Sequence, residues 1–306
     1  MEICPLCKGE TTDWFPGDPR VLQCRSCEIV FLSKKLQIKN LDDYYGLGNY
    51  WQDRLASPEN RELLYQNTRQ QLRLVVNCLR KPVAGLKLLD VGSHEGVFVE
   101  EANHLGFWAI GLEPNKLQVA QARDRGTPLF QGTIENWENS EDFDVITAFH
   151  ILEHVADPDR VLIKLAHCLK EGGLLVLEVP NIESFLARRH GLGWRFIALE
   201  HLFYFSPFTL NSLLDRTGFK IILSEKRNPE IAFLNLNQIS HYFVPRAVKR
   251  NSFAMKSLPL SGCSHLPPGV ALLRKLVGFL KIKKLAALAV KFLDREDHLF
   301  IIARKT

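Results

Sequence analysis

The sequence predicts an α/β protein built on a doubly wound, mostly parallel sheet. Short apolar runs bounded by turn residues alternate along the chain with segments of helical period, a pattern typical of βαβ units. The first clear run, residues 86–91, stops at a glycine turn that leads into a helical segment. With 306 residues, 46% of them hydrophobic, the chain is long enough for one main domain with appendages.

Residues 86–112 form the central unit. Residues 86–91 read as a strand buried on both faces, 97–105 have helical spacing, and 107–112 form a second apolar run. We expect this βαβ crossover to be right-handed.

The neighbouring segments continue the alternation. An apolar stripe predicts a helix over 58–79, with Ser57 as its N-cap before Pro58. After the central unit we expect a helix over 116–125, strands over 128–131 and 143–149, a helix over 158–169 and a strand over 174–179.

The glycine turn predicts a small-molecule site. Gly92 and Gly96 let bare backbone approach a ligand at the carboxyl end of the first strand. Glu113, at the tip of the second strand, stands where a carboxylate accepts both hydrogens of a ribose diol. His94 and Val97 replace two glycines of a dinucleotide fingerprint. The turn therefore predicts a nucleoside site and disfavours NAD.

Four cysteines near the N-terminus predict a structural zinc site. Cys4, Cys7, Cys24 and Cys27 form two C-x-x-C knuckles, whose thiolates suit tetrahedral zinc. Four free or disulfide-bonded cysteines are the alternative. We expect residues 1–33 to form a zinc ribbon.

Several motifs together resemble the class I S-adenosylmethionine-dependent methyltransferases. They are Leu89-Asp90-Val-Gly92 with Gly96 and Glu113, the segment 143–155, and Leu169-Lys-Glu-Gly172-Gly173. The resemblance covers roughly residues 86–225 and the C-terminal strand. It implies S-adenosylmethionine as cofactor. The cofactor-binding residues that it implies are Asp90, Gly92, Ser93, His94, Gly96, Glu113, Pro114, Thr133, Ile134, Phe149 and His150. Two positions depart from the family: His94 replaces a small residue, and Thr133 replaces an acidic residue that often holds the adenine amine.

The family's sheet implies the remaining organisation. Its seven strands have the order 3-2-1-4-5-7-6 with strand 7 antiparallel, so residues 219–224 become strand 6 and 298–304 become strand 7. We therefore expect a methyltransferase domain over 83–306 with an insertion over 228–297 between these strands. Residues 34–82 become an aromatic and helical connector, which covers the active site or packs between ribbon and domain.

Three histidines are candidates for catalysis: His150, His154 and His201. The segment around His201 resembles methyltransferases that act on nucleotide-linked sugars, which also carry a zinc ribbon, and this makes His201 the first choice for the base. A packed, hydrogen-bonded histidine is the alternative. The tyrosine of the sugar C-methyltransferases is Ala198 here, which leaves O- or N-methylation open.

A second resemblance concerns the segment after strand 4. His150-Ile-Leu-Glu153-His154 is similar to the Glu-x-x-Glu-His element of quinone-precursor O-methyltransferases, which is linked to a divalent metal. The alternative is that this stretch lines the part of the cofactor site that holds the methionine end of S-adenosylmethionine.

The C-terminal third carries an uneven charge. Residues 231–293 contain ten Lys or Arg and no Asp or Glu, although the net charge of the whole chain is only +5. Within this stretch, 269–293 has the pattern of a basic amphipathic helix, which lies on an anionic membrane or packs on the domain. Nucleic acid is disfavoured because leucines, not stacking aromatics, separate the basic residues.

Localisation follows from what the sequence lacks. No signal peptide and no apolar run of spanning length is visible, so we expect a cytoplasmic protein, with peripheral contact at the inner membrane face through 269–293.

The leading functional hypothesis is a methyltransferase acting on a sugar or glycoconjugate, nucleotide-linked or lipid-linked, with a histidine base. The alternative is O-methylation of a membrane-soluble phenol or quinone precursor. A third hypothesis is a non-catalytic nucleic-acid-binding protein that uses the ribbon and the basic insertion. Salt-dependent binding of RNA would support this hypothesis.

Overall fold

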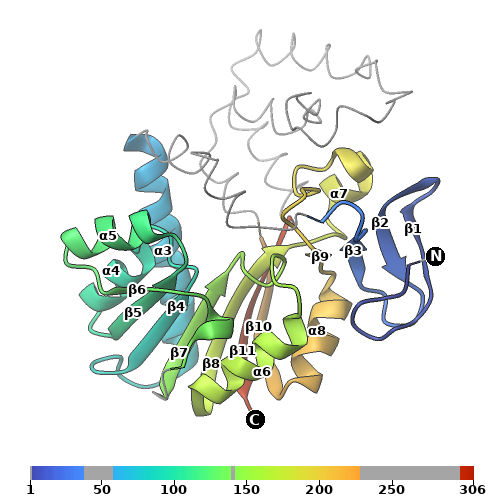
Figure 1. The fold of residues 1–306 in the computed structure, drawn as a ribbon. Helices are drawn as coiled ribbons and strands as arrows, with labels where there is room; N and C mark the ends of the chain where they lie inside the picture. Colours follow the sequence, from blue (N-terminus) through green and yellow to red (C-terminus); the bar gives the residue numbers. More distant parts are fainter. Residues whose placement is uncertain (1, 38–57, 139–141, 228–296) are drawn as a thin grey trace, which may run out of the picture.

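A seven-stranded sheet forms the centre of the molecule (Figure 1). The computed structural model describes residues 2–37, 58–138, 142–227 and 297–306. The strands of the central sheet are β4 (Lys87–Val91), β5 (Trp108–Glu113), β6 (Leu129–Gln131), β7 (Phe143–Phe149), β8 (Leu169–Pro180), β10 (Phe219–Arg227) and β11 (His298–Lys305).

The strand order confirms the predicted topology. Across the sheet the order is β6-β5-β4-β7-β8-β11-β10. Strand β11 is antiparallel to both of its neighbours, and the other pairs are parallel. Counted within this sheet alone, the order is 3-2-1-4-5-7-6. The labels differ because four strands of a second sheet are counted with them, three before β4 and one between β8 and β10.

Helices cover both faces of the sheet. They are α3 (Pro58–Leu79), α4 (Val97–His104), α5 (Lys116–Asp124), α6 (Pro158–Cys168) and α8 (Pro207–Arg216), whereas α7 (Phe185–His190) packs with the N-terminal strands. Apolar side chains of α3, α4 and α5 form one buried cluster with the sheet. Those of α6 and α8 form a second cluster. A sheet enclosed in this way buries its strands on both faces, which explains why they read as continuous apolar runs.

Two strands are longer than the sequence predicts. Strand β8 begins at Leu169, directly after α6, and its early start was missed because the next residues, 170–172, are exposed and carry no apolar signal. Strand β10 continues to Arg227, since its pairing with β11 extends past the last apolar residue to His298. The other predicted elements agree with the structure to within one residue at each end.

The N-terminal ribbon forms a second sheet, to which a strand from much later in the chain also belongs. Strands β1 (Thr11–Phe15), β2 (Asp18–Cys24) and β3 (Val30–Leu32) form an antiparallel sheet whose fourth strand is β9 (Phe203–Tyr204). Figure 1 shows this ribbon beside α7 and β9, on the side of the molecule away from α3 to α5. A segment that follows β8 in the chain therefore completes the ribbon.

Two predictions lie outside the described residues. The aromatic part of the connector, with Tyr44, Tyr45, Tyr50 and Trp51, falls in 38–57, and all but the last residue of the insertion, with its basic stretch 269–293, falls in 228–296. Among the described helices, none is long and apolar enough to cross a membrane.

Candidate active site

The glycine turn lies where β4 ends, as predicted. Gly92 and Gly96 have φ angles of +77° and +81°, which L residues with a side chain rarely adopt. The amides of Gly92 and Ser93 both donate to the Leu112 carbonyl, at 2.8 and 3.2 Å. These bonds hold the turn against the end of β5.

His94 takes an unusual backbone conformation within this turn. Its φ angle is +51°, in the left-handed region that is uncommon for residues other than glycine. The side chain is largely buried, and burial lowers the pKa of its imidazole. His94, which replaces the small residue usual in the family, therefore has a strained backbone and a neutral imidazole ring.

Glu113 ties the turn to the second strand. Its Oε2 accepts from the His94 amide at 2.9 Å, and its Oε1 accepts from the Asn115 amide at 2.9 Å. The side chain is buried, and burial raises the pKa of this carboxyl group. Each carboxylate oxygen can accept more than one hydrogen bond, so Glu113 retains acceptor capacity for a ligand diol.

Asp90 lies inside the sheet. Its Oδ1 accepts from the Thr147 hydroxyl at 2.6 Å, across the β4–β7 pair. Burial raises the pKa of its carboxyl group to about 7. The backbone carbonyl of Asp90 accepts from Ser93 Oγ at 2.6 Å, so Asp90 also supports the glycine turn.

Gly111 is a site residue that sequence analysis missed. A Cβ at this position in β5 would lie 2.2 Å from Ser93 Oγ and 2.3 Å from a Leu129 methyl group. The glycine turn therefore needs a residue without a side chain on the neighbouring strand. The signal was a glycine in the middle of an apolar run, which often marks a close approach of another segment.

The other predicted cofactor residues gather at the same edge. The Gly132 amide donates to the Glu113 carbonyl at 3.1 Å, which places Thr133 and the buried Ile134 beside Glu113. Pro114 is exposed after Glu113. Phe149 ends β7, with its ring 5.1 Å from that of Phe98.

His150 and Glu153 form a pair directly after β7. His150 Nδ1 lies 3.2 Å from Glu153 Oε1, and His150 has a φ angle of +56°. The His150 side chain is 38% exposed, whereas that of Glu153 is 1% exposed. Burial alone would raise the pKa of Glu153, but the hydrogen bond from His150 and the nearby histidines lower it to about 2. A buried, ionised carboxylate thus contacts a partly exposed imidazole.

His154 and His201 lie on the buried side of this pair. Their rings are 4.7 Å apart and nearly perpendicular. His154 Nδ1 lies 2.9 Å from the Glu200 carbonyl, and His201 Nδ1 lies 2.7 Å from the Phe196 carbonyl. Burial lowers the pKa of both imidazoles, which keeps them neutral.

These histidines also form a possible metal site. One ligand atom each of Glu153, His154 and His201 lie within 4.8 Å of one another. Within the described part of the chain, Glu153 Oε2 has no hydrogen-bond partner, although it is buried. A carboxylate oxygen and two neutral imidazoles fit a divalent ion. The grouping differs from the expected one, because His201 takes the place of His150.

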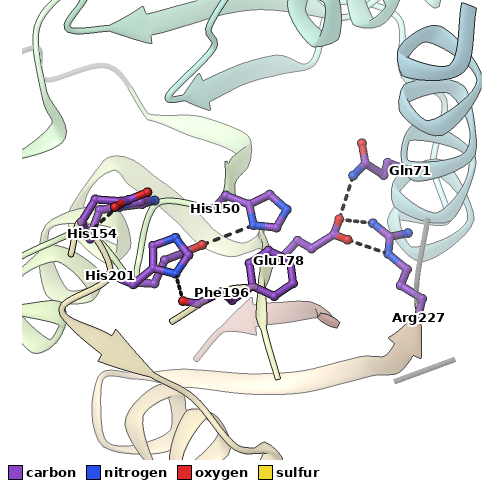
Figure 2. Close-up of polar contacts among 9 residues, drawn as sticks. Gln71, His150, His154, Glu178, Phe196, His201 and Arg227 are labelled. Carbon is purple, nitrogen blue, oxygen red and sulfur yellow. Dashed lines mark hydrogen bonds and ion pairs between the residues drawn. The ribbon is translucent and has the colours of Figure 1, made fainter. Parts of the chain in front are cut away.

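Glu178 occupies the end of β8 beside the histidines, and sequence analysis missed it. It accepts from Gln71 Nε2 of α3 at 2.9 Å and pairs with the guanidinium of Arg227, as Figure 2 shows. In that view His150 lies between Glu178 and the His154–His201 pair. The signal was a single carboxylate near the end of an otherwise apolar strand.

The last residue of the predicted insertion and the first residue of β11 also lie near the histidines. Buried Asp297 accepts from Ser184 Oγ at 2.8 Å and from Trp194 Nε1 at 3.0 Å, and Arg195 Nε lies 3.3 Å away. The ring of the next residue, His298, is 5.1 Å from that of His150.

The four ribbon cysteines come together as predicted. Cys4 Sγ lies 3.6 Å from Cys27 Sγ, and Cys7 Sγ lies 3.4 Å from Cys24 Sγ. All four sulfurs lie within 4.8 Å of one another. Zn–S bonds of about 2.3 Å in a tetrahedron place sulfurs about 3.8 Å apart, so the cluster fits a zinc ion.

The fold and the glycine turn together define a Rossmann-like α/β protein of the methyltransferase type. A family model described as a methyltransferase domain matches residues 60–224, more than half of the chain. The chain therefore belongs to this methyltransferase family.

Comparison with known proteins gives relatives of part of the chain. It is 34% identical over 112 residues to a ubiquinone biosynthesis O-methyltransferase of Nitrobacter winogradskyi, covering 35% of this chain and 41% of the relative. It is 30% identical over 162 residues to the mitochondrial ubiquinone biosynthesis O-methyltransferase of Homo sapiens, covering 46% and 43%. The chain thus spans about two fifths of the length of the curated relatives it matches.

A solved structure shares the fold. An S-adenosylmethionine-dependent methyltransferase from Archaeoglobus fulgidus superposes with a TM-score of 0.51 at 17% identity, covering 86% of this chain and all of that chain.

Proposed function

We propose that this protein is an S-adenosylmethionine-dependent O-methyltransferase whose acceptor is a phenol of the quinone-precursor class. The observation that carries the proposal is the His150–Glu153 pair at the end of β7, the strand that adjoins β4 and its glycine turn. Family membership and the O-methyltransferase names of the relatives support it. They favour the phenol over the sugar or glycoconjugate acceptor, for which neither the described residues nor the relatives add support.

The cofactor residues bind and orient the donor in this proposal. S-adenosylmethionine supplies a methyl group on a sulfonium sulfur, which is already activated for displacement. Glu113 accepts the ribose hydroxyls, and the backbone of residues 92–96 lies against the nucleoside. Fixing the donor in this way would lower the entropic cost of aligning it with the acceptor.

His150 is the base in this proposal. Glu153 accepts the hydrogen of His150 Nδ1, which makes Nε2 the nitrogen that takes the proton from the phenol hydroxyl. The acceptor oxygen forms a bond to the methyl carbon as the carbon–sulfur bond breaks. Sequence analysis ranked His201 first, but His201 is only 8% exposed, whereas the His150 side chain is 38% exposed.

His154 and His201 have a different role here. With Glu153 they would hold a divalent ion, which would lower the pKa of a bound phenol hydroxyl. The proposal also retains a structural zinc on Cys4, Cys7, Cys24 and Cys27, a methyltransferase domain over 83–306 and a connector over 34–82 that covers the site.

The test is a methyl-transfer assay with labelled S-adenosylmethionine. Three acceptors are compared: a catechol with a polyprenyl tail, a nucleotide sugar and RNA. We expect the label on the catechol hydroxyl. His150→Asn should lower the rate roughly 100-fold while S-adenosylhomocysteine still binds.

His104→Asn is the matched control. His104 lies on α4 with a side chain that is 68% exposed, so this variant should keep both activity and cofactor affinity. Label on the sugar alone would overturn the phenol proposal. Salt-dependent RNA retention without cofactor binding would favour the nucleic-acid hypothesis.

A further inference from the structure

We infer that strand β3 of the ribbon positions the acceptor half of the active site, in addition to folding around its cysteines. The inference rests on the proposed function only where methyl transfer is the measured quantity. Its starting point is the pairing of β3 with β9, because β9 begins two residues after His201.

The hydrogen bonds run without a break from the ribbon to the histidine cluster. Val30 pairs with Tyr204 and Phe31 with Phe203, and the Leu32 amide donates to the Leu202 carbonyl at 2.9 Å. The amide of Leu202 in turn donates to the Glu153 carbonyl at 2.7 Å. One residue thus joins β3 on one side to the backbone of Glu153 on the other.

The turn that carries His201 is closed by a hydrogen bond from Tyr204, a residue of β9. The Ala198 carbonyl accepts from the His201 amide at 3.2 Å and from the Tyr204 hydroxyl at 3.3 Å. Tyr204 is 1% exposed and packs in a cluster with Val30 of β3. The orientation of His201 therefore depends on β9, and β9 on β3.

Apolar packing reinforces this link. One buried cluster joins the ribbon to the segment after β8. A second contains ribbon residues together with Leu152, Leu202 and Phe203. By contrast, the hydrogen bonds within the glycine turn and those that the Glu113 carboxylate accepts all come from β4, β5 and the loops that follow them. A displacement of β3 should therefore disturb the histidines and leave the cofactor half intact.

The test replaces one backbone donor. Leu32→Pro removes the amide that donates to Leu202, whereas the next amide, Ser33, donates to Arg20 inside the ribbon. Leu32→Ala is the matched control, because it shortens the same buried side chain but keeps the amide. Zinc content and S-adenosylhomocysteine affinity, measured by calorimetry, establish that each variant is folded.

Ring-¹⁵N histidine NMR provides the readout that does not depend on activity. His201→Gln and His154→Gln variants assign the two signals among the ten histidines. We expect Leu32→Pro to shift both signals and to lower kcat roughly tenfold or more, with unchanged affinity for S-adenosylhomocysteine. Leu32→Ala should have a clearly smaller effect on both.

Cys7→Ser gives an independent arm if Leu32→Pro does not fold. Loss of zinc from the ribbon should shift the same two signals, again without loss of cofactor binding. Unchanged His201 and His154 signals in a folded variant of either kind would overturn the inference. A wild-type protein that transfers no methyl group to a phenol would instead refute the proposed function, while the NMR result would still decide the role of β3.

Discussion

The two halves of the site each contain a buried carboxyl group, but the pKa values of the two groups are shifted in opposite directions. In the cofactor half, burial raises the pKa of Asp90 to about 7, and its side-chain partner Thr147 is an uncharged hydroxyl. In the acceptor half, the histidines around Glu153 overcome the effect of burial and lower its pKa to about 2. Burial alone therefore does not determine charge in this protein; the neighbouring side chains do.

The difference matches two chemical tasks. In the proposed mechanism, a sulfonium donor needs a fixed surface, which the backbone of the glycine turn and the Glu113 carboxylate would supply. In the same proposed mechanism, removal of a proton needs a charge that stabilises the protonated base, and ionised Glu153 would supply this charge to His150. The predictions below test this division.

The largest effect is expected for Glu153→Gln. The amide keeps the shape of the side chain but removes the charge that orients and stabilises protonated His150. Methyl transfer should fall roughly 1000-fold, with cofactor affinity nearly unchanged. Single-turnover kinetics and calorimetry measure the two quantities. Equal losses of rate and affinity would show that the halves are not separate.

Asp90 should make stability depend on pH. Between about pH 4 and 7 native Asp90 stays protonated while the unfolded chain ionises, so the native state binds more protons and the free energy of unfolding falls as pH rises. The full change is about 4 kcal/mol. Urea unfolding at pH 5 and pH 8 should detect about 2.7 kcal/mol of this change, because about two of the three pH units lie between these conditions. Asp90→Asn should remove most of this slope, and an unchanged slope would refute the assignment.

Glu113→Ala should weaken S-adenosylhomocysteine binding about 100-fold, since a carboxylate that accepts charged hydrogen bonds contributes about 1.5–3 kcal/mol for each bond. Glu135→Ala, an exposed carboxylate on the short helix Ile134–Asn136, is the control and should bind normally. Calorimetric titration compares the two. Full affinity in Glu113→Ala would place the ribose elsewhere.

The smallest effect is expected for Gly111→Ala. The new methyl group would meet Ser93 Oγ and Leu129, so the glycine turn must shift. We expect a loss of stability of about 1–3 kcal/mol and roughly tenfold weaker cofactor binding. Gly126→Ala is the control for replacing a glycine by alanine, because no atom lies within 4 Å of the new Cβ. The φ angle of Gly126 is +81°, so this variant carries backbone strain but no clash. Thermal unfolding and calorimetry give both values.

The sequence predicted the cofactor half far better than the acceptor half. Gly92, Gly96 and Glu113 belong to one βαβ unit, so their spacing along the chain determines their placement in space. The periods of the apolar runs likewise identified the central strands and most of their limits.

The acceptor half joins segments that are far apart in the chain. The helices α6 and α7 and the strand β8 separate His150 from His201 in the chain, and Glu178 meets Gln71 and Arg227 from different elements. No local pattern encodes such contacts. The pairing of β3 with β9 was missed for the same reason, because a strand of only two residues, Phe203–Tyr204, has no period to detect.

That pairing also sets an order of events during synthesis. Val30 and its partner Tyr204 are 174 positions apart, so β3 leaves the ribosome long before β9 exists. At 5–20 residues per second, the interval is roughly 10–35 s. Throughout it the outer edge of β3 presents unpaired amides and carbonyls, which invite pairing with other chains. Early capture of metal by the cysteines would shorten the time during which the ribbon is unfolded, and the yield of soluble protein should therefore depend on the zinc supply while the chain is being made.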